Sequence, residues 1–327
     1  MDKNIQILQE LREKNGLFLA SRREVKTGYD KAWVRDNIYC ALGLEVIDAK
    51  KAILTYQALF DIFLKHEYKI DHAIKVKPQF AFEYIHARYN PITLEEFYDD
   101  WGNKQNDAIG AFLFKVGDLL DKEFKVIRDE NDNRILQKLV FYLNSVEYWH
   151  DKDSGMWEED QEIHASSVGA CVAGLKKISR YVYVPEDLIY KGEVKLNSLL
   201  PKESLTKKVD LALLSLIYPY NIVSAKQRDQ ILRNVEKHLI RKNGVIRYVG
   251  DKYYNDGFEA SWTLGFVWLA IIYKQLGQMK KYKSYLSKTF NVMNSKGELP
   301  ELYLSNGMPN ENTPLAWAQS MLVIASA

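Results

Sequence analysis

The chain has 327 residues, of which 47% are apolar and 27% are charged, and its 45 basic side chains nearly balance its 43 acidic ones. This composition is typical of a globular protein with a large buried core, and the balanced charge argues against a nucleic-acid partner. No apolar run reaches the roughly 18 residues of a membrane span, and the first residues lack a signal-peptide core, so we expect a cytoplasmic protein without a membrane partner.

The two cysteines, Cys40 and Cys171, both lie in apolar stretches rich in small residues. Two such positions form neither a disulfide framework nor the paired spacing of a metal site. We therefore expect two buried free thiols and a reducing compartment.

Helical periodicity recurs along the whole chain and predicts twelve helices that alternate in kind. The odd-numbered helices are amphipathic and the even-numbered ones are apolar on nearly all sides, which is typical of buried helices. In chain order they are 2–14, 36–47, 50–67, 107–120, 134–148, 163–178, 185–199, 208–217, 225–242, 259–276, 278–293 and 314–327.

The amphipathic kind is clearest at 225–242. One stripe of this segment carries Ile231, Leu232, Val235, Leu239 and Ile240, whereas its basic residues lie mostly off the stripe. The residues at its start, Ser224 and Gln227, have the spacing of a capping box.

Alternating buried and half-buried helices favour two concentric rings, six inner helices surrounded by six outer ones. We therefore predict an all-α, single-domain (α/α)6 toroid over residues 1–327. A globin-like bundle and a helical solenoid are the structural alternatives, although no repeat motif recurs at a fixed spacing, as a solenoid requires.

The connections alternate in length as well. Those leading into buried helices are mostly long, and loops beyond about 12–15 residues are usually functional. In an up-and-down array all of the long connections fall at one end, so we expect them to surround a pocket on the axis. They are 15–35, 68–104, 149–162, 243–258 and 294–313, whereas the fourth connection, near 202–206, is brief.

The long loops carry aromatic rings, carboxylates and two arginines, which suit the apolar faces and the hydroxyls of sugars. Each residue also has a simpler interpretation. Arg35 and Asp36 could form a structural ion pair with Asp36 as the helix N-cap, Trp33 and Trp101 could be core aromatics, and Glu301 could be a solvated turn residue. The candidate site residues are Trp33, Arg35, Asp36, Trp101, Trp157, Glu158, Glu159, Arg247, Tyr248 and Glu301.

Short segments follow one another in a distinctive order along the chain. They are Gly16-Leu17-Phe18, Ala32-Trp33-Val34-Arg35-Asp36-Asn37, Trp101-Gly102 with Gln105 and Asp107, Trp157-Glu158, Arg247-Tyr248 and Leu299-Pro300-Glu301. In this order the chain resembles glycoside hydrolase family 15, the glucoamylase and glucodextranase family of (α/α)6 toroids. It also resembles the glucoamylase-like domain of phosphorylase kinase regulatory subunits.

The resemblance implies a role for each candidate residue. Glu158 matches the general acid and Glu301 the general base that activates water. The remaining matches concern substrate binding: Arg35, Asp36 and Arg247 would grip sugar hydroxyls, and Trp101 would be a stacking wall. Trp33, Trp157 and Tyr248 belong to the matching segments, and Glu159 matches an acidic neighbour found in some members only.

The leading hypothesis is therefore an inverting exo-acting hydrolase of α-linked glucosides, with an α-glucan or α-glucoside oligosaccharide as its partner. Inversion requires the two carboxyl groups to be roughly 6.5–9.5 Å apart. Trp157 is expected to raise the pKa of Glu158, and Arg247 to favour ionised Glu301. This chemistry requires neither metal nor cofactor, and we expect none.

Two other classes of function compete with hydrolysis. Leu302 and Tyr303 follow Glu301 where hydrolases often have a glutamine, as in the kinase-subunit version, which favours a catalytically silent carbohydrate-binding or regulatory domain. A terpenoid cyclase would require an aspartate-rich or zinc-ligand cluster, which the sequence lacks. The sequence leaves linkage, chain-length preference, calcium binding and oligomeric state open.

Overall fold

The computed structural model describes residues 3–98 and 101–327. Residues 1–2 belong to the first expected helix, and residues 99–100 belong to the expected loop 68–104. These four positions lie outside the described residues, and the predicted domain range 1–327 includes them.

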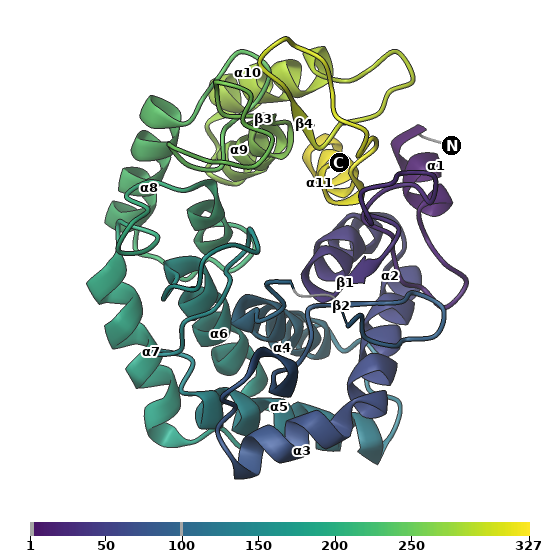
Figure 1. The fold of residues 1–327 in the computed structure, drawn as a ribbon, viewed down its shortest axis with the longest axis vertical. Helices are drawn as coiled ribbons and strands as arrows, with labels where there is room; N and C mark the ends of the chain where they lie inside the picture. The colour runs from purple at the N-terminus through teal and green to yellow at the C-terminus, as the bar shows by residue number, and fades with distance from the viewer. Residues whose placement is uncertain (1–2, 99–100) are drawn as a thin grey trace.

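Six helical segments form a closed inner ring (Figure 1). Each contacts the next, and the last closes the ring by packing against the first. In chain order they are the first half of α2 (Val34–Lys65), α4 (Asn106–Asp121), α6 (Ala165–Ile178), η2 (Leu211–Leu216), α9 (Leu264–Gln275) and α11 (Ala316–Ser326). A kink at Asp48 divides α2 into its two halves.

The amphipathic segments lie outside this ring. α1 packs on α11, α7 on α6, α8 on η2 and α10 on α9. The outer set consists of α1 (Lys3–Glu10), the second half of α2, α5 (Glu130–Val146), α7 (Glu186–Leu199), α8 (Ala225–His238) and α10 (Met279–Asn291). The predicted all-α fold, an (α/α)6 toroid with two concentric rings, is confirmed, and so is the capping box of Ser224 and Gln227 at the start of α8.

The inner helices approach closely because small residues lie where they touch. A Cβ atom on Gly110 of α4 would lie 2.4 Å from the backbone of Ala170 and Cys171 in α6, and one on Gly174 would lie 2.3 Å from the carbonyl oxygen of Gly110. Glycine is therefore required on both sides of this contact.

Three local predictions were wrong. The expected buried helix 208–217 is the shorter 3-10 helix η2, and Asp210 caps it by accepting a hydrogen bond from the amide of Ala212. α2 begins at Val34, so Asp36 lies in its first turn and is not its N-cap. The expected loop 68–104 contains the helix α3 (Glu67–Lys75) and the 3-10 helix η1 (Ala81–Glu83).

Two short strand pairs brace the long loops. β1 (Ala32–Trp33) pairs with β2 (Arg88–Tyr89), and β3 (Ser261–Trp262) pairs with β4 (Leu302–Tyr303), both antiparallel. Each pair ties the loop before one inner helix to another long loop, which fixes the ends of these loops at one mouth of the toroid.

Cys40 and Cys171 are free and buried, as expected. Within residues 3–98 and 101–327, no helix has the length and apolar character needed to cross a bilayer.

Candidate active site

Four of the five long loops contribute to one pocket on the toroid axis, which we call the axial pocket. It encloses about 70 Å³. Its lining residues are Ala20, Tyr29, Trp33, Arg35, Asp36, Met156, Trp157, Glu158, Arg247, Tyr253, Trp262, Glu301, Leu315 and Trp317. The geometry thus gathers seven of the ten candidate residues, and both candidate catalytic carboxyls, around one cavity.

Glu158 lies at the end of the turn 155–158, which we call the acid turn after the candidate acid that it carries. Its backbone is left-handed, with φ of 63°, a conformation that costs a non-glycine residue about 1–2 kcal/mol. Burial raises the pKa of its carboxyl to about 7, although the charge of Arg35 opposes the shift. The pKa of Glu158 is therefore raised, as expected, and a substantial fraction of this carboxyl is protonated near neutral pH.

The ring of Trp157 faces other partners. It packs against Trp262, with ring centres 5.5 Å apart, and its Nε1 donates a 2.8 Å hydrogen bond to Asp210 Oδ1. Asp210 is fully buried and also caps η2. The acid turn is therefore anchored to the fourth inner segment through the residue that precedes Glu158.

Glu301 is fully buried and held by three donors. Tyr29 Oη donates to its Oε1 at 2.6 Å, and the side-chain amides of Asn310 and Asn312 donate to its Oε2 at 2.5 and 2.8 Å. Burial raises the pKa of Glu301 above its ordinary value, and these hydrogen bonds and the charge of Arg247 offset part of that rise by favouring the ionised form. Arg247 acts in the expected direction, but the direct contacts come from Tyr29 and the two asparagines.

Arg35 connects the segment 32–37, in which it lies, with the start of α4 and with Glu158. Its Nη1 donates to Gln105 at 2.7 Å and to Asp107 at 3.2 Å, and its Nη2 lies 3.2 Å from Glu158 Oε1. Its distance to Asp36 is longer, 3.8 Å, and still that of an ion pair, so the structural ion pair considered for these two residues is present beside the other contacts. Burial raises the pKa of Asp36 to about 6 against the influence of Arg35.

Arg247 is also buried. It forms a paired contact with Asp251 at 2.7 and 2.5 Å and donates to Glu159 Oε1 at 2.6 Å. Tyr248 Oη and Lys207 Nζ donate to the other oxygen of Glu159 at 2.7 and 2.6 Å. Burial alone would raise the pKa of Glu159, but these partners outweigh it and lower the pKa.

Three candidate residues do not line the axial pocket. Glu159 and Tyr248 bind each other beside Arg247, and Trp101 stands behind Trp33, with its ring centre 6.1 Å away at a nearly perpendicular angle. Gly102, next to Trp101, allows close contact with the acid turn, because a Cβ atom there would lie 3.1 Å from the carbonyl oxygen of Glu158.

Several pocket residues carry polar atoms without a partner. The indole Nε1 atoms of Trp33, Trp262 and Trp317 and the Nε of Arg35 are buried and make no hydrogen bond to any described residue. Buried donors are normally satisfied by protein, water or ligand. A ligand with several oxygen acceptors would suit these four donors.

Several residues that complete the site are not among the candidates that the sequence indicates. Tyr253 and Asp251 lie in a segment whose aromatic and acidic composition was visible in the sequence. Tyr29, Asn310 and Asn312 had no such signal, because nothing in their local sequence shows that they converge on Glu301.

Comparisons with known proteins agree with this architecture. A probable phosphorylase b kinase regulatory subunit alpha of Caenorhabditis elegans is 25% identical over 90% of this chain, but the match covers only 30% of that subunit. The chain thus spans about a third of the length of this curated relative.

Solved structures share the fold. A glycosidase in complex with glucose superposes with a TM-score of 0.83 and 19% identity, over 99% of this chain and 94% of that one. A bacterial glucoamylase complexed with acarbose gives a TM-score of 0.68 and 16% identity, over 99% of this chain and 54% of that one. At these identities the similarity shows the fold alone. The profile of glycosyl hydrolases family 15 matches residues 2–266, and the chain therefore belongs to glycosyl hydrolases family 15.

Proposed function

We propose that the chain is an inverting, exo-acting hydrolase of α-linked glucosides, with Glu158 as general acid and Glu301 as general base. The observation that carries this proposal is the pairing of two carboxyls on one pocket in different environments, with Glu158 20% exposed and Glu301 fully buried. Glu158 has a pKa near 7, while Glu301 accepts three hydrogen bonds that favour its ionised form. Such a division suits an acid and a base that work together.

In the proposed reaction, Glu158 transfers its proton to the glycosidic oxygen as the bond from that oxygen to the anomeric carbon breaks. A water molecule attacks the anomeric carbon from the opposite face and gives its proton to Glu301. The product is β-glucose and a chain shortened by one residue. Arg35, Asp36 and Arg247 would hold the hydroxyls of the terminal sugar, and the unpaired indole donors would add further contacts.

The axial pocket encloses only about 70 Å³, so we expect lining side chains to move outward when a sugar ring enters. Side-chain changes of this kind are common on binding. The contact between Arg35 and Glu158 is the one that a ligand would most directly replace.

The proposal predicts that Glu158→Gln and Glu301→Gln each abolish glucose release from maltose and isomaltose. Each substitution removes a required proton transfer, and losing such a group costs roughly a hundredfold or more. NMR of the first-formed anomer measures stereochemistry, and the exposed Glu186→Gln is the matched control. Full activity in either active-site variant, or α-glucose as first product, would contradict the assignment.

A second candidate is a carbohydrate-binding or regulatory domain without turnover. The C. elegans relative is named a regulatory subunit. In this chain the residue after Glu301 is the apolar Leu302 of β4, which pairs with Trp262 of β3. Calorimetry with maltose beside the activity assay separates the two candidates. Binding without turnover across a broad panel of α-glucosides would favour the silent domain.

The single-domain range and the location are also part of this proposal. Closure of the inner ring between α2 and α11 supports one domain over residues 1–327. The free, buried thiols of Cys40 and Cys171 agree with a cytoplasmic, reducing location.

A further inference from the structure

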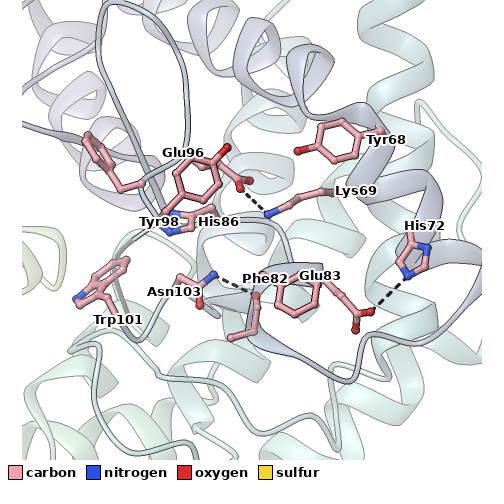
Figure 2. Close-up of a pocket in the computed structure, with 12 residues that line it drawn as sticks. Tyr68, Lys69, His72, Phe82, Glu83, His86, Glu96, Tyr98, Trp101 and Asn103 are labelled. Atoms are coloured by element: carbon pink, nitrogen blue, oxygen red, sulfur yellow. Dashed lines mark hydrogen bonds and ion pairs between the residues drawn. The ribbon is translucent and has the colours of Figure 1, made fainter.

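A second and larger cavity lies outside the axial pocket, between α3, η1 and residues 96–98 and 101–103 (Figure 2). We call it the side cavity. Its volume of about 660 Å³ falls within the range of roughly 300–1,000 Å³ that is typical of small-molecule sites. Neither the proposed acid nor the proposed base lines it, so the proposed chemistry leaves it without a role.

Exposed aromatic rings form much of the wall of the side cavity. Tyr68 on α3 is 64% exposed and Phe82 on η1 is 69% exposed, and Tyr98 is almost completely exposed. Phe80 stacks on Phe82 with ring centres 5.6 Å apart and planes 3° apart, so the two rings present parallel faces. Exposed rings of this kind offer apolar faces to a ligand that has flat apolar faces of its own.

Polar groups lie among these rings. Figure 2 shows Lys69 reaching from α3 to Glu96, with Nζ 2.5 Å from Oε2. The other oxygen of Glu96, Oε1, is buried and has no hydrogen-bond partner among the described residues, and His66 Nδ1 lies 3.8 Å from it. The Glu96 side chain is only 9% exposed, so a ligand hydroxyl reaches Oε1 only after a shift of that side chain. The bond would then satisfy a group that is costly to leave unpaired.

The side cavity carries two carboxylates and one ammonium group. Lys69 is paired with Glu96, and His72 Nε2, which is charged only when protonated, lies 3.6 Å from Glu83 Oε1. The two carboxylates disfavour a phosphorylated or strongly acidic ligand. Aromatic faces combined with these polar groups are suited to a hydroxyl-rich molecule without negative charge.

The side cavity shares a wall with the axial pocket. Trp101 lines the side cavity, and Trp33, 6.1 Å away in edge contact, lines the axial pocket. Asn103 Nδ2 donates to the carbonyl oxygen of Ala81 at 3.1 Å, which ties this wall to η1. A glucan held on the outer side of Trp101 would therefore lie next to the mouth where chain ends are proposed to enter.

We infer that the side cavity is a second, non-catalytic binding site for α-glucan chains. Glucose units stack on Phe82 and Tyr68 while their hydroxyls bond to Glu96 and its neighbours. The ligand class rests on the proposed function, and the inference extends it: the preferred substrate is a glucan of several residues, retained at the side cavity between successive cleavages.

The test uses β-cyclodextrin, a cyclic α-glucan that has no chain end to place in an exo-acting pocket. Calorimetry on the wild-type chain should show one site per chain. The double variant Tyr68→Ala/Phe82→Ala should bind at least roughly fivefold more weakly, because two stacking faces are lost. Glu96→Gln should also weaken binding, since it removes the charged acceptor and the partner of Lys69.

Tyr183→Ala is the matched control, because Tyr183 is 66% exposed and lies in the segment between α6 and α7. The inference is overturned if β-cyclodextrin does not bind, or if Tyr183→Ala weakens binding as much. It is also overturned if Glu96→Gln has no effect on binding, because β-cyclodextrin would then simply enclose one exposed aromatic side chain. Self-association of the chain through these rings, measured by sedimentation, would overturn it as well. These results are independent of the Glu158 and Glu301 assays, so either proposal can fail alone.

Discussion

At the scale of single residues, Glu158 combines two unfavourable features. Its backbone is left-handed, and desolvation raises the pKa of its partly buried carboxyl. Strain and perturbed pKa values concentrate at functional sites, and the combination favours a role for Glu158 that is more than structural.

The raised pKa predicts a specific pH dependence of stability. A carboxyl whose pKa is about 7 in the folded chain and 4.5 in the unfolded chain binds its proton more tightly when the chain is folded. Its contribution to the free energy of unfolding is therefore present below pH 4.5 and is lost as the pH rises through about 7. Glu158→Gln, which cannot ionise, should gain up to roughly 2.5 kcal/mol over wild type between pH 5 and pH 8.

Urea denaturation of both proteins at the two pH values measures this gain. Glu186→Gln, on the exposed surface of α7, serves as the control and should show no comparable change. A difference between Glu158→Gln and wild type that stays constant with pH would mean that the carboxyl titrates at its ordinary value.

The sequence identified residues whose neighbours along the chain are informative. The triplet at 157–159 and the pair Arg35 and Asp36 stand in recognisable segments. Tyr29 could not be found in this way, because it meets Glu301 only after folding brings together positions 272 residues apart. The contacts of Asn310 and Asn312 with Glu301 depend equally on the path of the loop between β4 and α11.

At the scale of elements, the contact between α4 and α6 depends on its glycines. Gly110→Ala would gain up to about 1 kcal/mol of helix propensity, but the new Cβ would lie 2.4 Å from the backbone of α6, which cannot move aside as a flexible side chain can. Overpacking of this kind costs about 1–3 kcal/mol. We expect a net loss of stability, measured as a lower urea midpoint.

Lys283→Ala on the exposed face of α10 is the control for the Gly110 prediction, because it changes no buried contact. A Gly110→Ala protein as stable as this control would show that α4 and α6 can separate without cost.

The elements were predictable where apolar periodicity persisted over several turns. The run from 208 to 217 predicts a helix, but the six residues of η2, five of them apolar, do not reveal whether the turns are α or 3-10. α3 was missed because its sequence, Glu67 to Lys75, alternates charged and apolar residues and buries only Ile70 and Ala73. Its amphipathic pattern covers only nine residues and is therefore assigned to the long loop from the sequence.

At the scale of the whole molecule, the last hairpin has two roles. α11 closes the inner ring between α9 and α2, and the loop before it supplies Glu301. The family profile matches residues 2–266, so the segment that completes both ring and site lies beyond the region of clearest sequence similarity.

Removing residues 314–327 should therefore open the ring. The apolar faces of α2 and α9 that α11 covers would be exposed to water, which weakens the hydrophobic stabilisation of the whole core. We expect loss of the cooperative thermal transition in circular dichroism and binding of a hydrophobic dye. Removal of Ser326 and Ala327 alone, both exposed, should leave the transition intact. A cooperative transition in the longer truncation would show that five hairpins suffice.

The position of Arg35 has a consequence for sequence variation among relatives and for the transfer of segments between proteins. One guanidinium is shared by the segment that starts α2, by Gln105 and Asp107 at the start of α4, and by Glu158 in the acid turn. A substitution in any one of these segments alters the guanidinium orientation on which the other two depend, so their effects should be strongly non-additive. The three segments are therefore expected to vary together among relatives, and transplanting one of them alone into another toroid should fail.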